Sequence, residues 1–272
     1  VLFRSVPTSP DRTAQELGAL AGHNYDWAVE DLRWCELHRY RNPEGRDRLA
    51  YTHHWAGCAD VLNDAGLFVA IASLPPRPVR APGMQWNLAV DMVSETCATV
   101  EEAADRLASV RHLRPMSYLL ADSGGNVGVV EALPEEVRFR GSTDGLVVAA
   151  NLCRGGRVLR DWTLEEPALR LDRPLSPRPE NYDEGSQERA ARRVERAVEL
   201  LGQADAIDLD VAAGVLTDHD APICTGDHSD ADGAPWGTIW SALCLPAGGE
   251  MRIAPGLPCR HSYQGFSVRP SD

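Results

Sequence analysis

A series of short apolar runs separated by turn sequences constrains the fold of this chain most strongly. The runs Ser117–Ala121, Val127–Ala132, Val137–Arg140 and Leu146–Ala150 are separated by turn residues rich in Gly, Asn and Asp. Apolar runs of this length between such turns are typical of β-hairpins, and hairpins in series form an antiparallel sheet. The Gly-rich turn after the first run is no phosphate loop, because a strand and not a helix follows it.

Helical patterns lie on both sides of these strands in the sequence. Gln85–Thr96 carries apolar residues at helical spacing, and a capping box after it opens a second helix that extends to Val110. Further along, Gln187–Leu201 has an apolar stripe, and Asp208–Leu216 begins with a capping aspartate. Serial hairpins with two helix pairs predict an α+β fold, a four-layer α-β-β-α sandwich of two antiparallel sheets.

Two further segments carry local predictions. Asp31–Tyr40 alternates apolar and polar residues and is predicted to be a strand. Arg154–Glu184 is polar and proline-rich with little periodicity, which predicts a long surface loop.

Composition limits the classes of function. With 272 residues and 43% hydrophobic composition, the chain is long enough for one large core, and we expect a single domain over residues 1–272. The net charge of −13 argues against nucleic acid and membrane surfaces as partners. The chain contains no Lys, which excludes a lysine nucleophile.

The cysteines indicate a reducing compartment. Seven cysteines are scattered along the chain without a Cys-x-x-Cys pair, and no apolar run has membrane-spanning length. We therefore expect reduced thiols and a cytoplasmic location. We keep a homo-oligomer as an alternative to a monomer.

The stretch Gly18–Trp27 is the strongest candidate for a functional site. Its apolar residues alternate at strand period, and it ends in the polar residues His23, Asn24 and Asp26. A strand of this kind can carry a carboxylate to a buried site. The alternative is an ordinary strand end in a hydrogen-bonded turn.

This stretch resembles the Gly-x-Asn-x-Asp-aromatic segment of the penicillin acyltransferase and choloylglycine hydrolase group, a peptidase C45-like branch of the N-terminal-nucleophile hydrolases. The turn Asn63–Leu67 and the strand-end residue Asn151 also match the group. The resemblance implies the same four-layer fold and a linear amide (C–N) hydrolase or acyltransferase that forms an acyl-enzyme on a small amide substrate. It implies that Asp26 orients the nucleophile, that Asn151 donates to the oxyanion, and that no cofactor takes part.

The resemblance also suggests residues that contact the substrate. These are His23, Asn24, Asn63, Trp55 and Trp236. His23 stands where bile-salt hydrolases have Arg, which argues against a bile-salt substrate. Trp236 lies where penicillin acyltransferase has a basic residue, so an anion contact there has no support.

The nucleophile is the point at which the sequence departs from the group. The resemblance implies a Cys that self-cleavage exposes at the amino terminus, yet no Cys precedes Cys35. Val1–Ser5 resembles the translation of a sequencing adapter, or it is a genuine short apolar start. Three explanations stay open: loss of the nucleophile by truncation, which we favour; Ser5 in its place; or an inactive copy that serves as a non-catalytic binding module.

Two clusters raise a metal hypothesis. The segment Asp218–Asp232 is rich in Asp and His and contains Cys224, but its spacing fits neither a Cys/His finger nor an EF-hand. We therefore predict no metal site and keep a metal-dependent hydrolase as a third possibility. His53 and His54 are adjacent on a predicted strand and should point to opposite faces, with one of them toward solvent.

Overall fold

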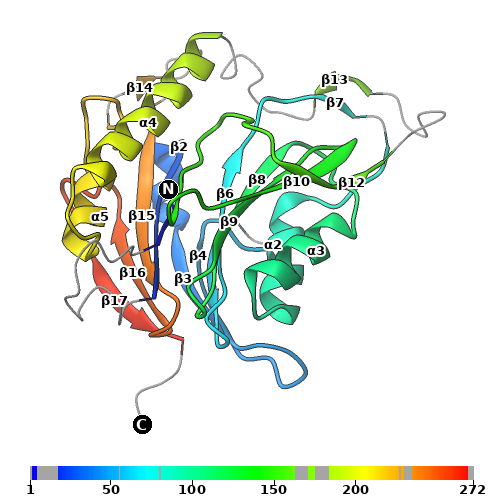
Figure 1. The fold of residues 1–272 in the computed structure, drawn as a ribbon, viewed down its shortest axis with the longest axis horizontal. Coiled ribbons are helices and arrows are strands. Elements are labelled where there is room, and N and C mark those ends of the chain that lie inside the picture. Colours follow the sequence, from blue (N-terminus) through cyan, green and yellow to red (C-terminus); the bar gives the residue numbers. More distant parts are fainter. Residues whose placement is uncertain are drawn as a thin grey trace.

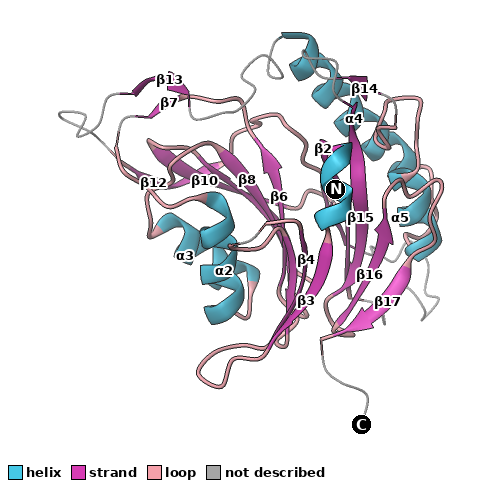
Figure 2. Ribbon diagram, turned by 180° about the vertical axis from the view of Figure 1, so that it is seen from behind, coloured by secondary structure: helices cyan, strands magenta, loops and turns pink. Residues whose placement is uncertain are grey.

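The computed structural model describes residues 2–4, 18–54, 56–79, 81–162, 171–174, 184–226, 228–229 and 235–268. Within these residues two sheets lie face to face, and helices cover both outer faces (Figure 1, Figure 2). Every strand pair inside the two sheets is antiparallel. The predicted α-β-β-α sandwich is therefore confirmed.

The first sheet is built around its two longest strands. Its order is β11-β1-β2-β15-β16-β17, and β14 pairs with β15. The bounds are β1 Leu2–Arg4, β2 Ala19–Ala28, β11 Leu146–Val147, β14 His228–Ser229, β15 Pro235–Leu245, β16 Glu250–Pro255 and β17 Gln264–Ser267.

The second sheet contains the predicted hairpin series. Its order is β12-β10-β9-β8-β6-β5-β4-β3. The bounds are β3 Glu36–Tyr40, β4 Arg48–Thr52, β5 Asp60–Asn63, β6 Phe68–Ser73, β8 Met116–Ala121, β9 Val127–Ala132, β10 Glu136–Gly141 and β12 Arg157–Asp161. A separate two-stranded ribbon joins β7 (Pro78–Val79) to β13 (Leu171–Pro174).

The two helix pairs take the predicted places. α2 (Trp86–Thr96) and α3 (Val100–Ala108) cover the second sheet, while α4 (Glu184–Gly202) and α5 (Leu209–Leu216) cover the first (Figure 1). The side chain of Thr99 accepts the backbone N–H of Glu102 and so caps α3, as the capping box predicts. None of the described helices combines the length and the apolar character that crossing a bilayer requires.

Two apolar cores hold these layers together. The larger core lies between the sheets and under α2 and α3, and its largest fully buried side chains include Trp240, Tyr118 and Phe68. The smaller core packs Val194 and Leu216, from α4 and α5, against residues of the first sheet such as Leu243. The shared burial of apolar faces explains why each sheet is covered on both sides.

β15 carries one extra residue beside β2. Thr238 pairs with Asp26 and Trp240 pairs with Tyr25, so Ile239 has no partner on β2. Such a bulge breaks the alternation of a strand, and Ile239 and Trp240 both belong to the core between the sheets. Thr238 lies beyond the bulge, next to Asp26 and on the side of α4.

The predicted strand over Asp31–Tyr40 is wrong in its first half. Val29–Trp34 forms a 3-10 helix, and β3 begins only at Glu36. The indole N–H of Trp27 donates to the Asp31 carboxylate at 2.8 Å, which draws the residues after β2 into a tight turn. Side-chain hydrogen bonds of this local kind compete with extended backbone.

Two other boundaries differ from the prediction. Arg154–Glu184 is not one loop, since β12 pairs with β10, β13 pairs with β7, and α4 begins at Glu184. The run after Gly145 leaves the hairpin series, because β11 pairs with β1 in the first sheet. The chain thus crosses between sheets just before residues 148–151, which places those residues at the site described next.

Candidate active site

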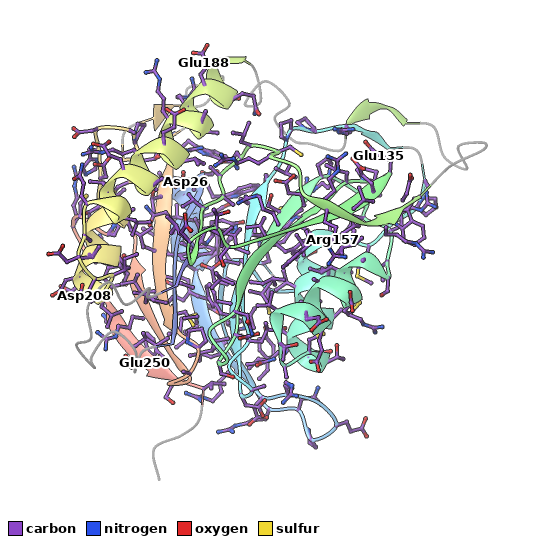
Figure 3. All side chains as sticks on the ribbon, in the orientation of Figure 1. Asp26, Glu135, Arg157, Glu188, Asp208 and Glu250 are labelled. Atoms are coloured by element: carbon purple, nitrogen blue, oxygen red, sulfur yellow. The ribbon has the colours of Figure 1, made fainter. Side chains whose placement is uncertain are left out.

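A cavity of about 680 Å³ opens where β2 and β6 end, beneath α4. Its walls come from β2, the end of β6, residues 148–151, α4, and three residues of the segment after α5: Pro222, Ile223 and Thr225. Figure 3 labels Asp26 on this side of the first sheet, next to α4. Segments from distant parts of the sequence therefore meet around one carboxylate.

Asp26 is held in place from β15. The hydroxyl of Thr238 donates to Oδ1 of Asp26 at 2.7 Å, and the same hydroxyl accepts the backbone N–H of Thr225 at 3.1 Å. Gly237 makes this approach possible, because a Cβ there would lie 2.4 Å from the carbonyl oxygen of Thr225. The carboxylate thus has a fixed orientation at the cavity wall.

Arg193 of α4 connects Asp26 to Asn151. One guanidinium nitrogen lies 3.6 Å from Oδ2 of Asp26, and the other donates to Oδ1 of Asn151 at 2.9 Å. Both charged side chains are about one-fifth exposed, at 23% for Asp26 and 21% for Arg193. Burial lowers the pKa of Arg193, and the Asp26 carboxylate opposes that shift. Because the ordinary pKa of a guanidinium lies far above neutral pH, Arg193 stays charged.

Asn151 is positioned with donor capacity left over. Its Nδ2 donates to the carbonyl oxygen of Ser73 at 3.0 Å, while its Oδ1 is occupied by Arg193. An amide nitrogen has two hydrogens, and among the described residues only Ser73 accepts one of them. A fixed side-chain amide with a spare N–H at a cavity wall is suited to donate to an oxyanion.

A family model described as acyl-coenzyme A:6-aminopenicillanic acid acyl-transferase matches residues 13–258. The chain belongs to this acyl-transferase family. A search of curated proteins found no match.

This acyl-transferase family member shares its fold with a bile acid hydrolase, a penicillin acylase and an acid amidase ortholog of known structure. A variant of conjugated bile acid hydrolase from Clostridium perfringens has a TM-score of 0.60 at 12% identity, covering 98% of this chain and 97% of its own. Penicillin V acylase from Agrobacterium tumefaciens has a TM-score of 0.57 at 13% identity, covering 98% and 85%. The Caenorhabditis elegans ortholog of N-acylethanolamine-hydrolyzing acid amidase has a TM-score of 0.51 at 11% identity, covering 91% and 93%.

A buried polar and aromatic cluster adjoins the cavity, and its members His23 and Tyr25 also line the cavity wall. Nδ1 of His23 is 3.0 Å from Oδ2 of the fully buried Asp60, and the same oxygen accepts the indole N–H of Trp240 at 2.7 Å. The ring of Tyr25 stacks on Trp240 with centroids 3.9 Å apart. This cluster ties β2, β5 and β15 together beneath the cavity.

The prediction for the two adjacent histidines is wrong. β4 ends at Thr52, so His53 and His54 do not alternate along a strand, and their rings lie 4.0 Å apart. Both Nε2 atoms lie within hydrogen-bond distance of the Tyr25 hydroxyl, at 3.3 and 3.1 Å. Burial lowers the pKa of both imidazoles, that of His54 to about 3.

The cavity brings together five of the predicted site residues. They are His23, Asn24, Asp26, Asn151 and Trp236. The amide of Asn24 donates to the carbonyl oxygens of Leu216 and Ile223, so it braces the wall that these residues form. Ser5 and Trp55 lie outside the described residues.

Asn63 lies elsewhere and does not line the cavity. Its side chain is fully buried and donates to the carbonyl oxygens of Ser94 and Cys97 at the end of α2. Its Oδ1 accepts the backbone N–H groups of Ala65 and Leu67. The structure thus gives Asn63 a role in closing the β5–β6 turn against α2.

Sequence reasoning missed Arg193, Thr238 and Asp60. Arg193 belongs to the polar face of an amphipathic helix, where charged residues usually face solvent. Thr238 lies near the start of a long apolar strand, and no pattern within that strand indicates Asp26 as its partner. Asp60 carries no sequence signal that separates it from a surface aspartate.

Proposed function

We propose that this chain belongs to an amide hydrolase or acyltransferase that acts through an acyl-enzyme on a small amide. The observation that carries the proposal is the connected set Thr238–Asp26–Arg193–Asn151 at the wall of one cavity. Membership in the acyl-transferase family supports the same reaction class. Each residue in this set has a distinct role in the mechanism.

The attacking group in this mechanism is an amino-terminal residue that serves as its own base. Its free α-amine, with a pKa of roughly 7.7–8.0, takes the proton of its side chain as that side chain attacks the amide carbonyl carbon. Asp26 orients the amine, and the spare N–H of Asn151 stabilises the oxyanion. The C–N bond then breaks and the amine leaves with the proton, after which water or a second amine takes the acyl group.

The register of β1 bears on where that nucleophile belongs. Leu2 pairs with Ala21 and Arg4 with Ala19, so the Leu2 end of β1 is the one nearer Asp26. From Ala21 to Asp26 the strand spans about 16 Å. A nucleophile carried by this strand would therefore lie on the amino-terminal side of Leu2. Ser5 follows Arg4 in the sequence, and Arg4 is at the other end of the strand.

The test expresses the complete reading frame of the gene and measures intact mass and the amino-terminal residue of the mature protein. The protein is then incubated with phenoxymethylpenicillin, a glycine-conjugated bile acid and an N-acylethanolamine, and amine release is followed. We expect a mature Cys, Ser or Thr, an acyl adduct on that residue, and turnover of at least one amide. Adding a primary amine as acceptor separates transfer from hydrolysis.

Two variants and one control connect the activity to the cavity. Asp26→Asn and Asn151→Ala should each lower kcat by about 10²- to 10³-fold. Cys153→Ser is the control, because the Cys153 thiol donates to Glu131 outside the cavity. A mature start without a nucleophile and no acyl adduct with any of the three amides would leave the binding module as the function.

A further inference from the structure

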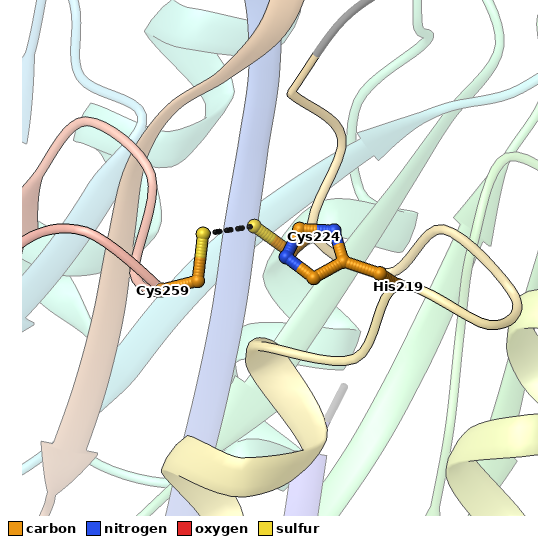
Figure 4. Close-up of side chains that lie close together, drawn as sticks. All are labelled: His219, Cys224 and Cys259. Carbon is orange, nitrogen blue, oxygen red and sulfur yellow. Dashed lines mark hydrogen bonds between the residues drawn. The ribbon is translucent and has the colours of Figure 1, made fainter.

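A second cavity lies beside the active-site wall and brings three metal-ligating side chains together. His219 and Cys224 come from the loop between α5 and β14, and Cys259 comes from the loop between β16 and β17 (Figure 4). The cavity measures about 370 Å³, and all three residues line it together with Leu257 and Arg260. It is separate from the catalytic set.

The spacing of the ligand atoms fits a tetrahedral ion. The two sulfur atoms are 3.7 Å apart, and each residue offers an atom within 4.8 Å of the other two. Zinc bound at about 2.3 Å from two thiolates in tetrahedral geometry places those sulfurs about 3.7 Å apart. The two sulfurs therefore stand at the separation that a shared zinc ion requires, and the imidazole of His219 lies near enough to complete the set.

The chemistry of the ligand set selects the metal. Two thiols and one imidazole are soft and intermediate ligands, which favour zinc over the hard ions magnesium and calcium. Cys224 is buried, whereas His219 and Cys259 are exposed, so an ion could enter from solvent and keep water as its fourth ligand. Each cysteine loses its proton to solvent when the metal–sulfur bond forms.

We propose that His219, Cys224 and Cys259 bind one zinc ion that fastens the residue 218–226 loop to the loop carrying Cys259. The two residues that flank Cys224, Ile223 and Thr225, line the active-site cavity. The carbonyl oxygen of Ile223 accepts a hydrogen bond from the Asn24 amide, and the backbone N–H of Thr225 donates to the Thr238 hydroxyl that holds Asp26. The ion would thus support the catalytic wall without touching substrate, and the proposal does not depend on the reaction proposed above.

The test measures zinc in the purified chain by elemental analysis, after incubation with zinc and gel filtration. We expect about one zinc per chain. His219→Ala and Cys259→Ser each remove an exposed ligand and should weaken zinc affinity, measured against a competing chelator, by at least about 100-fold. Cys153→Ser removes an exposed thiol at another place and should keep the wild-type affinity.

Cobalt in place of zinc gives an independent readout. We expect a thiolate-to-cobalt charge-transfer band that falls by about half in Cys259→Ser. Far-ultraviolet circular dichroism shows that each variant is folded, and if Cys259→Ser fails to fold, His219→Ala decides the outcome. Wild type that retains no zinc would overturn the proposal, as would a Cys224–Cys259 disulfide found by peptide mass, or variants that hold zinc as tightly as wild type.

Discussion

The half-buried imidazole of His54 makes the stability of this fold depend on pH, and one variant isolates the effect. The ring packs against His53 and Trp86, with centroids 4.0 and 4.9 Å away, and its Nε2 is 3.1 Å from the Tyr25 hydroxyl. Burial, with smaller contributions from His53 and Arg114, lowers the pKa of His54 to about 3. In the unfolded chain the same imidazole has a pKa of about 6.5.

The lowered pKa of His54 makes the folded state less stable as the pH falls. Because the pKa is lower in the folded state, the unfolded chain takes up the proton first as the pH falls. The contribution of His54 to stability is therefore complete above about pH 6.5 and is lost progressively toward about pH 3. Each pH unit in this window costs about 1.4 kcal/mol, so acidification from about pH 7 to about pH 5 should cost about 2 kcal/mol from this group.

The assay is urea unfolding at these two pH values. His54→Gln keeps a hydrogen-bonding group near the Tyr25 hydroxyl but does not titrate, so its loss of unfolding free energy should be about 2 kcal/mol smaller than that of wild type. His261→Gln removes an exposed imidazole and should behave like wild type. Equal losses in wild type and His54→Gln would refute the argument from burial.

Two further variants test the roles of single side chains. Arg193→Met removes the guanidinium between Asp26 and Asn151 and should lower kcat by about 10- to 100-fold. Arg192→Met, on the exposed side of the same helix, should leave kcat unchanged. Equal activity of these two variants in a steady-state assay would contradict the positioning role of Arg193. Asn63→Ala leaves four backbone groups around a fully buried side chain without their partner and should cost about 3 to 5 kcal/mol in urea unfolding. Gln203→Ala removes an exposed amide that bonds the exposed Glu199 carboxylate and should cost under about 1 kcal/mol. Similar losses in these two variants would show that the buried hydrogen bonds of Asn63 contribute little.

Local patterns in the sequence were enough to predict the layers of the fold. The capping residues Thr99 and Asp208 act as their sequence contexts predict, since an N-cap is recognised from a few neighbouring residues. The hairpins of the second sheet follow from alternation and turn residues. The strand end that carries Asp26 was identifiable for the same reason.

Long-range partners account for what the sequence left undetermined. The contact of Arg193 with Asp26 depends on how α4 lies across the first sheet, and no pattern within α4 distinguishes Arg193 from Arg192. Cys224 and Cys259 meet across 35 residues, so a search for metal-ligand spacing within one loop could not find the pair. His53 and His54 were misjudged because the strand before them ends at Thr52, so neither histidine belongs to it.

The unpaired residue in β15 has a consequence for how this protein is compared with its relatives. Ile239 lets neighbouring parts of one strand present Trp240 to the inter-sheet core and Thr238 to Asp26. Deleting that single position would rotate Thr238 away from the Asp26 carboxylate, although all four residues of the set would still be present in the sequence. An alignment without a gap against a relative whose strand is regular would therefore match Thr238 with the wrong residue. The number of residues between Thr238 and Trp240 is thus as informative about a working site as their identity.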